Sequence, residues 1–176
     1  PGSAAAIRYA ADKGAHVINM SLGGPLPSRV MAKAVEYAHE KGTTVICAAG
    51  NEKRSRVSYP AAYDQPNILS VAATDSDDNL ASFSQYGSNV DLAAPGVQIL
   101  STTPNNGYSS FSGTSMATPI AAGLAAAGVR HFRLELVDEP ARLVGPLARR
   151  YRALLDGRDD DDGDAAGGGD GDGGGG

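Results

Sequence analysis

The chain has 176 residues, 41% of them hydrophobic, with a net charge of −5 and one cysteine. This length fits one domain or part of a larger one. No apolar run is long enough to span a bilayer, and a lone Cys47 cannot form an internal disulfide. Seven aspartates and no basic residue lie in 159–176, so 1–158 is close to neutral and has no basic patch for nucleic acid.

Residues 1–127 alternate segments of helical and strand pattern, and glycines follow most of them. Helices are expected over Ser3–Lys13 and Ser28–Lys41. Short strands are expected over His16–Leu22, Thr43–Ala49, Asn67–Thr74, Val90–Ala93 and Gln98–Thr102. This order predicts an α/β fold with a mostly parallel sheet flanked by helices. Functional loops in such sheets lie beyond the carboxyl ends of the strands.

The last 49 residues change in character. Residues 128–158 are rich in arginine, and Leu134–Leu155 could form one or two amphipathic helices, broken near Pro140 and Pro146. Residues 159–176 contain mostly Asp and Gly, a composition that predicts a disordered tail. Two explanations stay open for this region: a genuine extension, or an out-of-frame reading of a GC-rich gene.

A serine on a glycine turn precedes a helix-forming run. Residues 112–119 read Ser-Gly-Thr-Ser-Met-Ala-Thr-Pro. A serine at a helix start has its own N–H and the positive end of the helix dipole beside it, the setting that a serine nucleophile needs. Ser115 is therefore a candidate nucleophile, and the alternative is an ordinary helix N-cap. Pro119 is expected in the first turn, where its missing N–H costs little.

Two predicted strands end in further candidates. The run Thr43–Ala49 leads into Gly50 and Asn51, and the Asn51 amide could donate to an oxyanion or belong to a plain turn. The strand before it leads into Ser21-Leu22-Gly23-Gly24. This stretch is either a simple loop or an exposed edge along which a peptide main chain pairs.

Six short sequence segments carry a resemblance to a known family through their wording and their order along the chain. They are Asn19-Met20-Ser21-Leu22-Gly23-Gly24, Ala48-Ala49-Gly50-Asn51-Glu52, Tyr59-Pro60-Ala61, Ala81-Ser82-Phe83-Ser84, Ala93-Ala94-Pro95-Gly96 and Ser112-Gly113-Thr114-Ser115-Met116-Ala117-Thr118-Pro119. Together they resemble the subtilisin-like serine proteases, or subtilases, over residues 1–127. The alternative is a parallel-sheet domain without this function, and it would require all six segments to match the family by coincidence.

The resemblance implies a serine endopeptidase that acts through an acyl-enzyme on Ser115, with Asn51 as the oxyanion-hole side chain. Two sets of positions match substrate-binding segments of the family. The edge that pairs with substrate main chain matches Ser21, Leu22 and Gly23. The wall of the pocket for the side chain before the cut bond matches Ala48, Ala49 and Gly50.

The resemblance also implies polypeptide substrates, an extracellular location, and no cofactor or metal in the chemistry. A structural Ca²⁺ in the full-length protein stays open, and a weak cation site at the carbonyls of Ala61 and Tyr63 occurs in some family members. The Tyr59–Pro60 bond matches a place where the family often has a cis proline. We expect no nucleic-acid or membrane partner.

The chain departs from the family in its catalytic base. The family's triad Asp and His precede the segment matched here, and the chain begins at Pro1, so we expect a missing N-terminal part of the same catalytic domain to supply them. None of the histidines, His16, His39 and His131, lies in a His-Gly-Thr-His type motif. Asp75 matches an ordinary loop, and Ile120 stands where the family commonly has a histidine outside the triad.

Two functional hypotheses result. The chain is either the C-terminal part of a subtilisin-like endopeptidase, nearly inactive by itself because an unassisted serine hydroxyl is a weak nucleophile, or a truncated pseudoprotease. In the second case it would bind peptides along Ser21–Gly24 without cutting them.

Overall fold

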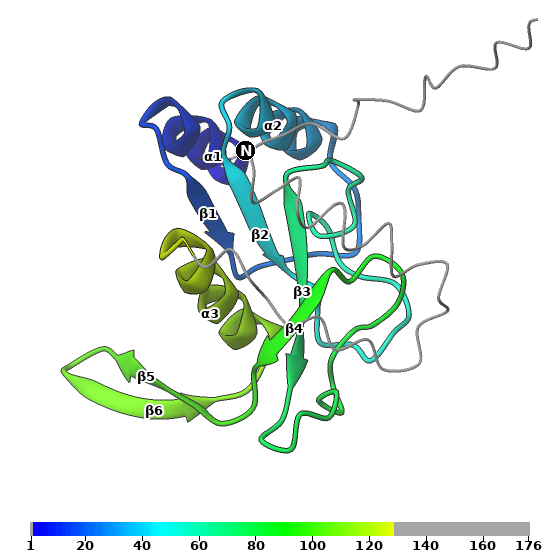
Figure 1. Ribbon diagram of the computed structural model, residues 1–176, viewed down its shortest axis with the longest axis vertical. Helices are drawn as coiled ribbons and strands as arrows, with labels where there is room; N and C mark the ends of the chain where they lie inside the picture. Colours follow the sequence, from blue (N-terminus) through cyan, green and yellow to red (C-terminus); the bar gives the residue numbers. More distant parts are fainter. Residues whose placement is uncertain (1, 129–176) are drawn as a thin grey trace, which may run out of the picture.

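The computed structural model describes residues 2–128, in which three helices flank a four-stranded sheet (Figure 1). In chain order the elements are α1 (Gly2–Asp12), β1 (Val17–Met20), α2 (Arg29–Glu40), β2 (Thr44–Ala48), β3 (Ile68–Thr74), β4 (Leu92–Pro95), β5 (Ile99–Thr103), β6 (Gly107–Phe111) and α3 (Thr114–Ala126). The predicted α/β class is therefore confirmed, and the predicted helices and strands of residues 2–103 each correspond to an observed element.

The main sheet has the strand order β1-β2-β3-β4, and every neighbouring pair is parallel. Met20 pairs with Cys47 and Ala48 with Val71, so β1 and β2 end almost level with one another, whereas β3 and β4 continue to the Thr74–Pro95 pair. Because parallel strands end at a common edge, the segments that follow β1 and β2 emerge side by side. This is the edge where the candidate residues lie.

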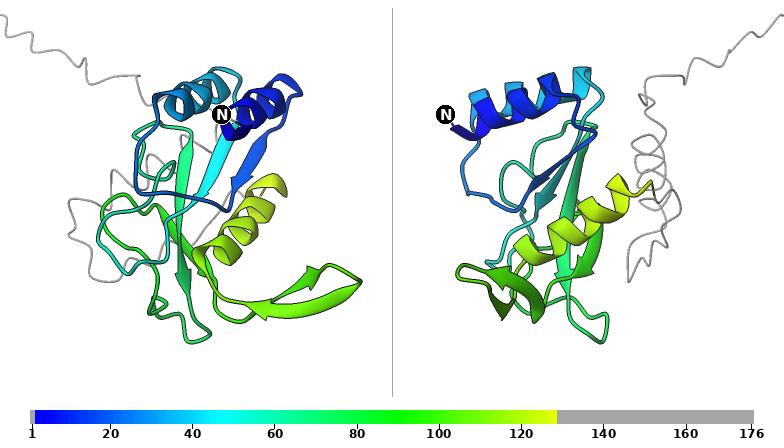
Figure 2. Two further views of the ribbon diagram at one scale, coloured as in Figure 1. Left: turned by 180° about the vertical axis from the view of Figure 1, so that it is seen from behind. Right: turned by 90° about the vertical axis from the view of Figure 1, so that its left-hand side faces the viewer.

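Each face of the sheet has its own apolar core. Val45 and Cys47 of β2 pack with α1 and α2, whereas Ile46, between them, packs with α3. Alternate residues of a strand point to opposite faces, so β2 contributes to both cores and reads as one continuous apolar run. The helices α1 and α2 thus form one layer and α3 the other (Figures 1 and 2).

A two-stranded hairpin projects from the body of the protein beside α3 (Figures 1 and 2). Its strands β5 and β6 are antiparallel, and Ile99 pairs with Phe111 at the base. The connection contains Asn105 and Asn106, both with positive φ, followed by Gly107. The strand over Gln98–Thr102 is confirmed as β5, but its partner β6 was not predicted.

The start of α3 differs from the sequence-based expectation. Gly113, not Ser115, occupies the N-cap position, and Pro119 lies inside the helix. Pro119 is the sixth residue of α3 and therefore lies beyond the first turn. Its missing N–H removes a regular helix hydrogen bond, contrary to the prediction.

The Tyr59–Pro60 peptide bond is cis, as the resemblance implied. Residues 129–176 are outside the described part of the chain, so the helices within Leu134–Leu155 and the tail at 159–176 stay predictions, as do the segment boundaries at 127 and 158. Among residues 2–128, no helix combines the length and apolarity needed to cross a membrane.

Candidate active site

Two residues far apart in sequence meet where β1 ends and α3 begins. The Ser115 hydroxyl donates a hydrogen bond to the Ser21 carbonyl at 3.2 Å, and the Ser21 hydroxyl donates to the Ser115 carbonyl at 2.9 Å. Ser115 is the second residue of α3, so its backbone N–H belongs to the unpaired first turn of that helix. Its hydroxyl is half-buried rather than sealed in the core.

The Asn51 side chain is oriented by the residue just before Ser115. Asn51 Oδ1 accepts hydrogen bonds from the Thr114 N–H and the Thr114 hydroxyl, each at 2.9 Å. The same hydroxyl accepts the Gly50 N–H at 3.2 Å. Because the amide oxygen is occupied by two donors, the Nδ2 group of the exposed Asn51 remains as the donor. Asn51 and Ser115 are thus held together through Thr114.

Gly50 is the backbone position that this arrangement constrains most. Its φ of +117° is one that L side chains rarely adopt, and a Cβ there would lie 1.3 Å from Gln85 Oε1. Gln85 also receives the Ser58 hydroxyl at 3.1 Å, and its own N–H donates to the Gly50 carbonyl at 3.0 Å. Gln85 and Ser58, both buried, therefore lie directly behind the Gly50–Asn51 corner.

The segment after β1 reaches the same place. A Cβ on Gly23 would lie 2.9 Å from the Ser58 Cβ, and Gly24 forms an antiparallel bridge with Tyr59. The predicted substrate-binding segments, Ser21–Gly23 and Ala48–Gly50, are therefore both in contact with Ser58 or its neighbours.

The two substrate-binding segments differ in exposure. Leu22 and Gly23 are exposed, whereas Ala48 and Ala49 are buried. The Ala49 backbone is already paired, through its N–H with the Val71 carbonyl and through its carbonyl with the Ser58 N–H. Ala48 and Ala49 therefore form a rigid base at this edge, and Gly50 is the partly exposed member of the trio.

Sequence reasoning missed four residues of this neighbourhood. They are Asn19, Ser58, Gln85 and Thr114. Two of them carried a signal, because Thr114 directly precedes Ser115 and Asn19 opens the sequence segment that contains Ser21. Ser58 and Gln85 lie in connecting segments where nothing marks their side chains as part of a site.

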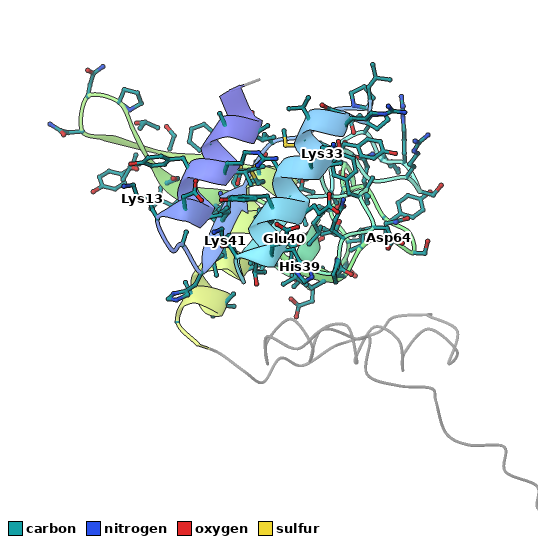
Figure 3. The ribbon with its side chains drawn as sticks, turned by 90° about the horizontal axis from the view of Figure 1, so that it is seen from above. Lys13, Lys33, His39, Glu40, Lys41 and Asp64 are labelled. Atoms are coloured by element: carbon teal, nitrogen blue, oxygen red, sulfur yellow. The ribbon has the colours of Figure 1, made fainter. Side chains whose placement is uncertain are left out.

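The two described histidines are far from Ser115. His16 precedes β1 and Ser21 follows it, and the five residue steps between them span about 16 Å in an extended strand. His39 lies in the last turn of α2, in the layer on the other face of the sheet from α3 (Figure 3). Neither histidine is the partner of the Ser115 hydroxyl, which donates to the Ser21 carbonyl. His131 lies outside the described residues.

No group of three or more His, Cys, Asp or Glu side chains within residues 2–128 is arranged to hold a metal ion. Whether the carbonyls of Ala61 and Tyr63 bind a cation stays a prediction. Cys47 is in β2, and its side chain faces the α1–α2 core. Burial, with the nearby charge of Asp91 adding to it, raises the pKa of this thiol far above its ordinary value. A thiol in that state is not a nucleophile.

Comparison with known proteins decides the family. A sequence profile described as the subtilase family matches residues 3–133, which is most of the chain. The chain belongs to the subtilase family. Its similarity to thermitase from Thermoactinomyces vulgaris is 54% identity over 119 residues, and to subtilisin BL from Lederbergia lenta 49% over 120 residues.

The subtilase match covers only part of the relatives. The alignments use 68% of this chain in both cases but 42% of thermitase and 44% of subtilisin BL. A mutant of the protease domain of PatA superposes with a TM-score of 0.67 at 34% identity, covering 71% of this chain and 47% of that domain. The chain therefore spans less than half the length of these subtilases.

Proposed function

We propose that this chain is the C-terminal part of the catalytic domain of a serine endopeptidase, with Ser115 as nucleophile. The observation that carries the proposal is that Thr114, which directly precedes Ser115 at the start of α3, donates its N–H and its hydroxyl to Asn51 Oδ1. The Asn51 Nδ2 group and the Ser115 N–H are then two donors available to a developing oxyanion. Substrates are polypeptides, and the protein acts outside the cell, as the family resemblance implies.

The chemistry proceeds in two stages. The Ser115 hydroxyl attacks the scissile carbonyl while a base takes its proton, and the two donors stabilise the tetrahedral oxyanion. The amine product leaves, and water then hydrolyses the acyl-enzyme. The base is a histidine oriented by an aspartate, contributed by polypeptide outside the described residues. The chain tested by itself is therefore expected to turn over substrate very slowly, because little of the rate survives without the base.

The test is to join the chain to an N-terminal segment that carries the aspartate and histidine, and to treat the product with a biotinylated fluorophosphonate. We expect labelling at Ser115 by peptide mapping, none in Ser115→Ala, and full labelling in the control Ser109→Ala, on the exposed strand β6. Asn51→Ala should lower kcat about 10²- to 10³-fold, a range known from a subtilisin itself. A label on any other residue would refute the assignment.

One observation favours a second function. The Ser115 hydroxyl donates to a backbone carbonyl, and no side chain of residues 2–128 is placed to accept its proton. A pseudoprotease that binds peptides along Ser21–Gly24 would have this property. It predicts a soluble monomer that binds extended peptides in calorimetry. Absence of binding at millimolar peptide, or an upstream reading frame that encodes the aspartate and histidine motifs, would exclude it.

A further inference from the structure

A proline, Pro119, occupies the position in α3 whose N–H would normally donate a hydrogen bond to the Ser115 carbonyl. In an α-helix the N–H of residue 119 bonds to the carbonyl of residue 115. Pro119 has no N–H to donate. The Ser115 carbonyl instead accepts the Ser21 hydroxyl at 2.9 Å. A side chain at the end of β1 thus takes the place of the missing helix donor.

The direction of the Ser21 hydroxyl is set by Asn19. The Asn19 Nδ2 group donates to Ser21 Oγ at 3.0 Å, while Asn19 Oδ1 lies 3.5 Å from the same oxygen. A serine hydroxyl has one proton, and the Ser115 carbonyl at 2.9 Å is the nearer acceptor. The proton of Ser21 is therefore directed at Ser115, with Asn19 holding the oxygen from behind.

A second bond runs in the opposite direction. The Ser115 hydroxyl donates to the Ser21 carbonyl at 3.2 Å, so each residue donates its hydroxyl to the backbone of the other. Two crossed bonds fix both the distance between α3 and β1 and the rotation of the first helix turn.

We propose that Ser21 is a positioning residue. Its side chain holds the Ser115 N–H and hydroxyl in the position along the end of β1 that the reaction needs. The inference rests on the proposed function, because the position matters only if Ser115 reacts. It is separate from the substrate pairing expected of the Ser21 main chain. Small misplacements of a reacting group are costly, and losing one such hydrogen bond is expected to slow the reaction about tenfold.

A double-mutant cycle tests this role through Pro119. Pro119→Ala restores an N–H at position 119 and inserts a good helix former, so the variant is expected to fold. In the joined protein, Ser21→Ala should slow fluorophosphonate labelling about tenfold when Pro119 is present, and less than about threefold in the Pro119→Ala background. Ser110→Ala, on the exposed strand β6, is the matched control and should leave the rate unchanged. Equal losses in both backgrounds, or no loss in either, would overturn the inference.

A spectroscopic measurement separates this inference from the protease assignment. Ser115-Met116 is the only Ser-Met pair in the sequence. Labelling serine carbonyls with ¹³C and methionine amides with ¹⁵N therefore selects the Ser115 carbonyl signal in the full chain. Ser21→Ala should shift that signal upfield when Pro119 is present and leave it nearly unmoved in Pro119→Ala. If the chemical shift of the Ser115 carbonyl does not change in Ser21→Ala, the inference is refuted. If the expected changes occur but fluorophosphonate does not label Ser115, the protease assignment is refuted and the hydrogen bond from Ser21 to Ser115 is supported.

Discussion

Adding a methyl group at Gly50 should destabilise the protein strongly. The loss should exceed that from the same change at a glycine that also has a positive φ but no neighbouring atoms. A Cβ at Gly50 would lie 1.3 Å from Gln85 Oε1 and 2.7 Å from the Ser58 hydroxyl oxygen. Gln85 is buried and cannot swing into solvent without giving up its bonds. Those bonds are the Ser58 hydroxyl at 3.1 Å and the Arg56 carbonyl.

The expected loss can be worked out from these contacts. A side chain at φ +117° strains the backbone by about 1–2 kcal/mol. Each hydrogen bond that Gln85 gives up contributes about 1 kcal/mol. We therefore expect Gly50→Ala to lower the free energy of unfolding by about 3–4 kcal/mol, a large share of the roughly 5–15 kcal/mol of an ordinary domain.

Gly14→Ala is the matched control. Gly14 has a φ of +75°, but nothing lies within 4 Å of its added Cβ, so only the backbone strain of about 1 kcal/mol should appear. Urea unfolding of the full chain, followed by circular dichroism, gives both values from the midpoints at constant m. If Gly50→Ala costs no more than Gly14→Ala, the close contact with Gln85 does not matter. In a Gln85→Ala background, the cost of Gly50→Ala should fall.

Two further predictions concern Thr114 and Cys47. Thr114→Val removes the hydroxyl shared by the Gly50 N–H and Asn51 Oδ1, and should slow fluorophosphonate labelling of the joined protein about tenfold; an unchanged rate would mean that Asn51 needs no such support. Because burial, followed by the charge of Asp91, raises the pKa of Cys47, the folded state keeps a proton that the unfolded chain loses above roughly pH 8.5. Relative to Cys47→Ala, the free energy of unfolding should then fall by about 1.4 kcal/mol per pH unit above that value in urea titrations, and parallel pH profiles would contradict it.

The sequence was most informative where the backbone pattern is strict. The alternation of helical and strand patterns predicted a mostly parallel sheet, and the apolar runs within Thr43–Ala49 and Asn67–Thr74 became its buried strands β2 and β3. The carboxyl ends of β1 and β2 then brought Ser21 and Asn51 to one edge of the sheet, and the start of α3 placed Ser115 at the same edge. Their chemical roles remain predictions, since geometry places groups but does not show turnover.

What the sequence did not predict depends on tertiary contact or on a weak local pattern. Gln85 lies in a connecting segment, and its place behind Gly50 arises only when distant segments pack together. The strand β6 reads Gly-Tyr-Ser-Ser-Phe, without clear alternation of apolar and polar residues. The Asn105-Asn106-Gly107 stretch at the turn between β5 and β6 was the available hairpin signal. Pro119 was misplaced because the helix begins at Thr114, one residue ahead of the serine.

The separation of the two helix layers has a practical consequence for attaching this protein to a solid support. Three of the four lysines, Lys13, Lys33 and Lys41, belong to the α1–α2 layer (Figure 3), whereas the strand tips point away from that layer (Figure 1). The fourth, Lys53, comes two residues after Asn51. Replacing Lys53 with arginine would confine amine-directed coupling in residues 2–128 to the outer helices, so that an immobilised protein would present the Ser115 edge to the surrounding liquid.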